Sequence, residues 1–209
     1  MPVALIYAIG FLAQVFFSAR ILVQWVMTER AHKVLSPSVF WIFSLCGSYL
    51  LCLYGWLRTD FSIVLGQFIS YYVYLWNLRA KGIWDKLHIV FRAVLLLTPV
   101  AAICWAARDA SGFVESFLRN DEIPLWMVVW GSLGQVIFTF RFVYQLLYSR
   151  HRGESVLPAG FWLMSLTGAL IIVSYGELRL DPVLILGQSF GLVAYVRNLL
   201  IGSRSRRTA

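Results

Sequence analysis

Two arginines, Arg20 and Arg141, lie inside strongly apolar stretches, each between two glutamines at the same spacing. Both occupy the motif Gln-x-x-Phe-x-x-Arg-x-x-x-Gln, whose glutamines are Gln14, Gln24, Gln135 and Gln145. At 100° per residue, the residues of one motif fall within about 120° of a helix surface. A guanidinium stays charged when partly buried and can bind a phosphate through two parallel N–H donors. The pattern predicts that each arginine lines a polar cavity.

Snorkelling is the alternative interpretation of the same arginines. Arg20 is seven residues from the expected helix end at residue 27, about 10 Å along the axis, so its side chain could reach lipid headgroups. An arginine inside a membrane costs roughly 3 kcal/mol or more unless it faces a partner or a wet cavity. Snorkelling does not explain the glutamines on the same face, which favours the cavity.

A second polar face recurs in two later apolar stretches. Its members are Gln67, Tyr74 and Asn77 in the first stretch, and Gln188, Tyr195 and Asn198 in the second. Their alternative role is hydrogen bonding between helices, worth about 0.6–2 kcal/mol each. Packing and ligand contact both remain open for these residues.

Helix boundaries are marked by proline and aspartate. Pro37 and Pro158 each open an apolar stretch, either as a hinge or as an ordinary first helical residue, with Ser36 available as an N-cap for the first. Asp60 and Asp181 are predicted to cap the helices that follow them.

The sequence lacks the residue patterns that several kinds of chemistry need. The cysteines and histidines have no metal-ligand spacing, and no nucleophile–base pair or phosphate-binding loop is found. We therefore expect no metal, no cofactor and no catalytic residue. The net charge of +8 is spread over short loops and the C-terminal end, so we expect no nucleic-acid partner.

The composition is that of a membrane protein. Hydrophobic residues make up 60% and charged residues 13%, whereas soluble domains have about 45–50% and about 25%. A membrane span needs about 20 apolar residues. Seven stretches qualify approximately: 3–27, 38–57, 61–79, 87–107, 123–148, 159–177 and 182–201.

The first three stretches and the last three are copies of one unit. A shift of 121 positions aligns rare polar residues without a gap, among them Gln14 with Gln135, Arg20 with Arg141, Pro37 with Pro158, Ser44 with Ser165, Gln67 with Gln188 and Asn77 with Asn198. The stretch 87–107 lies between the copies, so both should run in the same direction. We predict an all-α integral membrane protein with seven transmembrane helices in a 3+1+3 parallel repeat. Its parts are residues 1–79, a linker with a connector helix at 80–122, and residues 123–209.

Lysines and arginines predict the orientation of these helices. They are concentrated in the loops that contain Arg30, Lys81 and Arg152 and at the C-terminal end, and are sparser around Arg58 and Arg179. The richer side is expected to be cytoplasmic. We therefore expect a multi-pass protein of the cytoplasmic (inner) membrane, with its N-terminus outside and its C-terminus in the cytoplasm.

The motifs resemble those of the lipid-A-biosynthesis N-terminal domain family, which is related to PQ-loop and SWEET-like membrane proteins. The glutamine–arginine motif carries this resemblance, together with Pro-x-x-Phe-Trp-x-x-Ser-x-x-Gly and, in the first copy, Leu-Gly-Gln-x-x-x-Tyr-x-x-Tyr-x-x-Asn-Leu, over residues 10–79 and 131–200. The sequence departs from the PQ-loop pattern, with Ser38 and Ala159 at the glutamine position and Val193 opposite Tyr72. By resemblance to SWEET-type carriers, Asn77 and Asn198 would face a substrate cavity.

Three functions follow as hypotheses. The first is a transporter or flippase that binds a phosphate-bearing glycolipid, such as a lipid A precursor or a polyprenyl-phosphate sugar. The second is a non-catalytic membrane module that docks a lipid A enzyme or glycosyltransferase. The third is a small-sugar carrier, which the paired arginines disfavour because a neutral sugar offers them no counter-charge. The family is found fused to lipid-A-disaccharide synthase, and this sequence ends without room for that domain, so we expect no enzyme activity.

Overall fold

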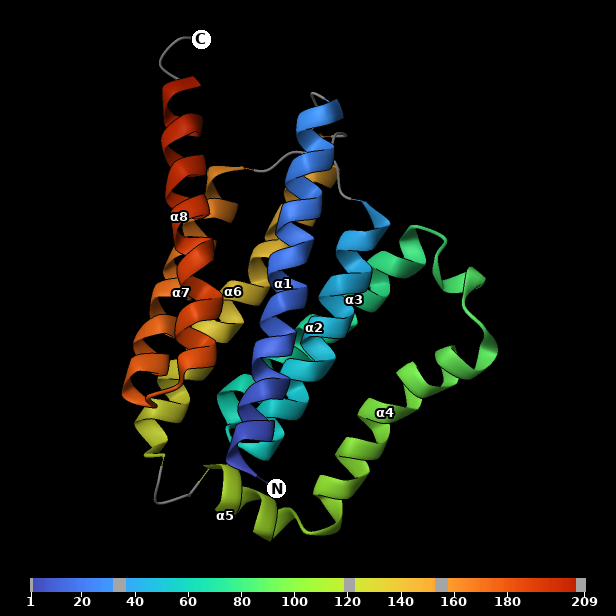
Figure 1. Ribbon diagram of the computed structural model, residues 1–209, viewed down its shortest axis with the longest axis vertical. Helices are drawn as coiled ribbons and strands as arrows, with labels where there is room; N and C mark the ends of the chain where they lie inside the picture. Colours follow the sequence, from blue (N-terminus) through green and yellow to red (C-terminus); the bar gives the residue numbers. More distant parts are fainter. Residues whose placement is uncertain (1, 32–36, 119–122, 153–157, 206–209) are drawn as a thin grey trace. The chain divides into compact units, whose positions relative to one another are not determined.

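The computed structural model describes residues 2–31, 37–118, 123–152 and 158–205, and every regular element in these segments is a helix (Figure 1). The long helices are α1 (Val3–Ala31), α2 (Ser38–Leu57), α3 (Phe61–Ala80), α4 (Ile89–Arg108), α6 (Leu125–Arg152), α7 (Ala159–Leu178) and α8 (Pro182–Ser205). The 3-10 turn η1 (Trp84–Lys86) and the short helix α5 (Ala110–Leu118) complete them. Each stretch predicted from the sequence therefore contains one long helix, whereas α5 was not predicted.

Among the described residues, five helices are long and apolar enough to cross a membrane, namely α1, α2, α4, α6 and α7. The helix α3 carries more polar residues, and α8 contains a shorter apolar segment, Pro182–Val193. These features fit a membrane protein, and the seven-span 3+1+3 arrangement stays a prediction. The chain divides into two compact units, residues 1–128 and 129–209, which are described separately below.

In the first unit, α2 packs along both α1 and α3. Its buried face includes Ser44, Gly47 and Ser48, small residues that let the neighbouring helices approach closely. The hydroxyl of Ser48 donates to the backbone carbonyl of Gln67 on α3 at 3.0 Å. Among the described residues, α1 and α3 do not pack extensively on each other, so α2 is the centre of this unit.

The turn between α2 and α3 is a Schellman motif followed at once by an N-cap. Thr59 has a left-handed φ of 49°, and the N–H of Asp60 donates to the carbonyl of Gly55 at 2.9 Å. The carboxylate of Asp60 then accepts from the N–H of Ile63 at 3.1 Å. One residue thus ends the first helix and begins the next, which explains the short hairpin.

The second unit repeats this turn between α7 and α8. Leu180 has the same φ of 49°, and the N–H of Asp181 donates to the carbonyl of Gly176 at 2.8 Å. The carboxylate of Asp181 accepts from Val183 and Leu184 at 3.0 and 3.2 Å. Both predicted aspartate N-caps are confirmed.

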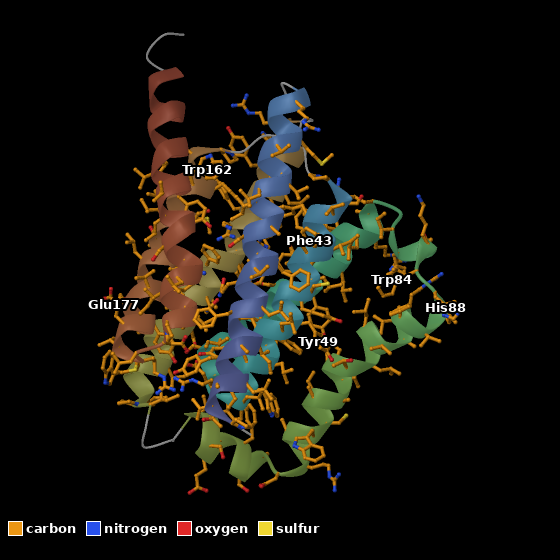
Figure 2. The ribbon with its side chains drawn as sticks, in the orientation of Figure 1. Phe43, Tyr49, Trp84, His88, Trp162 and Glu177 are labelled. Atoms are coloured by element: carbon orange, nitrogen blue, oxygen red, sulfur yellow. The ribbon has the colours of Figure 1, made fainter. Side chains whose placement is uncertain are left out.

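The helix α4 is the most exposed long helix of the first unit, and Pro99 is the one buried residue among its described positions. The proline has no N–H to donate to the carbonyl of Leu95 four residues earlier. The hydroxyl of Tyr71 on α3 donates to that carbonyl instead, at 2.7 Å. Figure 2 shows Trp84 and His88 at the turn that leads into α4.

The short helix α5 packs through aromatic rings on the end of α2. The ring of Trp56 lies 6.0 Å from that of Phe113 and 5.3 Å from that of Phe117. The two phenylalanines are stacked on each other at 4.6 Å. Asp109 caps the helix by accepting from the N–H of Gly112 at 2.9 Å.

Candidate functional site

Arg20 lies inside the three-helix bundle of the first unit, where its side chain is 7% exposed. Its Nη1 donates to the hydroxyl of Ser44 on α2 at 3.0 Å and to the hydroxyl of Tyr74 on α3 at 3.2 Å. These two bonds join α1 to α2 and α3. The guanidinium is therefore fixed in orientation by one of its two terminal nitrogens.

Aromatic rings surround the same guanidinium. The Cζ of Arg20 lies 4.6 Å from the ring centroid of Phe17, 5.3 Å from that of Phe40 and 5.9 Å from that of Tyr74. A cation near an aromatic face gains about 0.5–2 kcal/mol, with the larger values where water is excluded. Phe17, Phe40 and Tyr74 therefore offset part of the cost of burying this charge.

The hydrogen bonds leave one edge of the Arg20 guanidinium open. Its Nε is buried and forms no hydrogen bond with the described residues, and both of the hydrogen bonds given above are made by Nη1. Nε and Nη2 together make the side-on fork that binds a carboxylate or a phosphate through two parallel bonds. The site thus presents a fixed pair of donors for an anion.

Arg141 in the second unit lies among the equivalent aromatic rings. Its side chain is 3% exposed, and its Cζ lies 3.4 Å from the ring centroid of Phe138, 5.8 Å from that of Phe161 and 5.9 Å from that of Tyr195. These rings are the repeat partners of those around Arg20. Ser165, the partner of Ser44, is likewise buried and donates to the carbonyl of Phe161 at 2.7 Å.

Neither arginine is near the end of its helix. The helix α1 continues to Ala31, eleven residues beyond Arg20 and about 16 Å along the axis, rather than ending at residue 27. The guanidinium of Arg20 is held by α2 and α3 instead of extending toward the helix end. The snorkelling interpretation does not describe this arginine.

The predicted glutamines differ in burial. Gln67 and Gln135 are buried, at 8% and 4% exposed, whereas the others, Gln14, Gln24, Gln145 and Gln188, are half-buried. Tyr195 is half-buried, and Asn77 donates to the carbonyl of Val73 in its own helix at 2.8 Å. The side chain of Asn198 lies outside those described. Among the predicted residues of the first unit, Arg20 and Tyr74 are joined by a hydrogen bond.

The two prolines stand at helix starts. Pro37 and Pro158 are the N-cap residues, and each carbonyl accepts from the N–H three residues later at 3.0 Å. The prediction that Pro37 is the first helical residue is off by one position, because α2 begins at Ser38 and an N-cap keeps extended torsions. Ser36, the predicted cap, lies outside the described residues. The hinge role stays a prediction.

Sequence reasoning did not place Ser44 and Phe40 in the site. Both recur in the second copy, as Ser165 and Phe161, and both are buried on the face of α2 that meets Arg20. Their recurrence in both copies was a usable signal. The sequence did not show how α2 is rotated about its axis relative to α1, and this rotation decides which residues of α2 face Arg20.

Both units contain a buried arginine among aromatic rings, and their helices include apolar ones long enough to cross a membrane. The class is therefore a helical protein with a repeated unit and helices of membrane type. Residues 9–79 and 130–200 each match the Lipid A Biosynthesis N-terminal domain family. The chain therefore belongs to this family and contains its domain twice, which confirms the resemblance and the duplication.

Curated relatives are similar to this chain along nearly its whole length. They include the lipid-A-disaccharide synthases of Chlamydia pneumoniae (28% identical, 99% of this chain, 35% of the relative), Chlamydia abortus (30%, 95% and 33%) and Chlamydia trachomatis serovar D (28%, 95% and 34%). The chain spans about one third of the length of these relatives. No solved structure matches it.

Proposed function

We propose that this protein binds a phosphate-bearing glycolipid of lipid A or envelope biosynthesis and moves it across the cytoplasmic membrane. The observation that carries the proposal is the open Nε–Nη2 edge of Arg20, fixed in place by Ser44 and Tyr74. A phosphate fits this edge because it accepts two parallel charge-assisted hydrogen bonds. The family membership supports a lipid with a sugar head group.

The physical reason for an anionic ligand is that the helices around Arg20 place no acidic residue close to it in sequence. The sequences of α2 and α3 contain no Asp or Glu, and the one in α1 is Glu29, about 13 Å further along the helix axis. A charge buried without a partner costs several kcal/mol, more than the nearby rings offset. A bound phosphate would supply the missing negative charge.

The remaining elements of the proposal come from the sequence. The two copies would run parallel, with the N-terminus outside and the C-terminus in the cytoplasm, and each would bind phosphate through its own arginine. The polar glutamine, tyrosine and asparagine side chains would contact sugar hydroxyls. Pro37 and Pro158 would let α2 and α7 tilt as the lipid passes.

Movement of a lipid-linked sugar phosphate in reconstituted vesicles tests the proposal. Arg20→Gln and Arg141→Gln, singly and together, should reduce the rate at least tenfold, and Arg20→Lys should restore it only in part, because lysine keeps the charge but not the fork. Arg79→Gln, at an exposed position near the end of α3, is the control and should leave the rate unchanged. Full movement in the double variant would overturn the proposal.

The docking module is the second candidate, and the relatives favour it. They are synthases about three times as long as this chain, so the matching region occurs there in one polypeptide with further sequence. Under this function, affinity-purified protein would retain a glycosyltransferase in mild detergent. A carrier would be recovered alone and would still move lipid after reconstitution.

A further inference from the structure

Among the described side chains of α1, α2 and α3, Arg20 is the one buried cation. The other basic residues in these three helices are Arg30 and Arg79, and both are exposed. Arg30 is ten residues beyond Arg20, about 15 Å along α1, and Arg79 is five residues beyond Tyr74, about 7.5 Å along α3. These helices therefore offer a ligand inside the bundle a single positive charge.

Hydrogen-bond donors are also scarce around this charge. The buried Nε of Arg20 forms no hydrogen bond with the described residues, whereas its Nη1 is bound to Ser44 and Tyr74. The hydroxyl of Ser44 already donates to the carbonyl of Phe40 at 2.6 Å. The rings of Phe17 and Phe40 lie against the guanidinium and have no donor. An anion beside Nε is thus bound through one edge of the guanidinium, which offers two parallel donors.

The two common kinds of lipid phosphate differ in charge and in the oxygens that need donors. A phosphodiester carries one negative charge on two non-ester oxygens, whereas a phosphate monoester above about pH 6 carries close to two charges on three oxygens. One guanidinium edge satisfies both oxygens of the diester and cancels its charge. The monoester would leave a negative charge and an oxygen unpaired among aromatic rings, and burying an unpaired charge is unfavourable.

We propose that the first unit selects a lipid whose sugar is joined through a single phosphodiester, rather than a lipid with a terminal phosphate monoester or a diphosphate. This inference rests on the proposed function, in which Arg20 binds the phosphate. It narrows the ligand to a singly charged glycolipid, such as a sugar joined to a polyprenol through one phosphate. Phe17, Phe40 and Tyr74 account for the selectivity, because they surround the guanidinium with rings instead of a second cation.

Binding of two lipids that differ by one methyl group tests the inference. The probes are radiolabelled polyprenyl phosphate and its methyl ester, which is a diester. Each is titrated at about pH 5.5 and at about pH 8 on the full chain in detergent, with scintillation proximity as the readout. The change Arg141→Gln confines phosphate binding to the first unit.

The measured quantity is the ratio of the two affinities at each pH. In the Arg141→Gln variant this ratio should shift at least about tenfold in favour of the methyl ester at the higher pH, because the singly charged form of polyprenyl phosphate is scarce there. The methyl ester has no second proton to lose, so it reports any effect of pH on the protein itself. An unchanged ratio would overturn the inference.

Two further measurements separate the possible failures. The natural chain should show the same shift, since each unit binds phosphate through its own arginine. Tight binding of polyprenyl phosphate at the higher pH by the natural chain, lost in Arg141→Gln, would mean that the two arginines share one doubly charged phosphate, and the inference would be wrong.

Arg20→Gln, added to Arg141→Gln, should weaken both lipids at both pH values. If it weakens neither lipid, the proposed function fails together with the inference. If it weakens both lipids while their affinity ratio is independent of pH, the choice of a phosphodiester fails and the proposed function stands.

Discussion

The hydrogen bond from Tyr71 to the carbonyl of Leu95 makes a prediction that can be tested with a double-mutant cycle. Pro99 withholds the N–H that would satisfy this carbonyl within α4, and the Tyr71 hydroxyl replaces it at 2.7 Å. Hydrogen bonds between helices in membranes contribute about 0.6–2 kcal/mol. Tyr71→Phe keeps the ring and should lower the free energy of unfolding by about 1 kcal/mol in the natural background. In a Pro99→Ala background, residue 99 supplies the N–H, and the same change should cost close to nothing.

Denaturant unfolding in detergent, followed by far-ultraviolet circular dichroism, measures the four corners of this cycle. The coupling between the two positions should be about 1 kcal/mol, well above the few tenths that independent sites show. Tyr72→Phe is the matched control, because Tyr72 is 45% exposed and has no described hydrogen bond. An equal cost for Tyr71→Phe in both backgrounds would refute the role of the proline-freed carbonyl.

Two more predictions concern backbone geometry. Leu180→Gly should raise the free energy of unfolding by about 1 kcal/mol, because Leu180 is 82% exposed at a left-handed φ of 49° that glycine adopts without strain; an unchanged unfolding midpoint would contradict this. Gly168→Ala should lower the free energy of unfolding by about 1–3 kcal/mol, because the new Cβ would meet the backbone of Phe138 at 2.8 Å. Gly47→Ala should lower it less, because its Cβ would meet the ring of Phe17, which can move. Thermal unfolding of the two variants side by side checks the order, and the reverse order would show that the Phe17 ring cannot move.

The long helices could be predicted because their signals are local. Apolar length defines each stretch, and Asp60 and Asp181 mark two of the starts through an N-cap that needs no tertiary context. The helix α5 was missed since nine residues are too few for a span. Its evidence is tertiary: Phe113 and Phe117 gain their partner only when the end of α2 places Trp56 beside them.

The candidate site was predictable in its charge but not in its surroundings. The spacing in the sequence singled out Arg20 and placed Tyr74 on a polar face, and the structure joins the two by a hydrogen bond. The sequence could not show that Ser44 shares this contact or that Nη1 alone is occupied, because both depend on the rotation of α2. The open edge of the guanidinium is thus a property of packing.

Differences between the two copies have a structural cause in the connector. Tyr71 and Trp56 contact α4 and α5, whereas their repeat partners are Leu192 and Glu177, and Glu177 is exposed. A tyrosine hydroxyl is useful at this position only where a proline has freed a carbonyl, as at Leu95, and a tryptophan only where rings cover it. The copies therefore diverge where the first unit binds the connector, and they agree in the aromatic rings around the arginines. Retention of the arginine and its rings in both copies, while neighbouring positions changed, supports the proposed function, in which each arginine binds the same group.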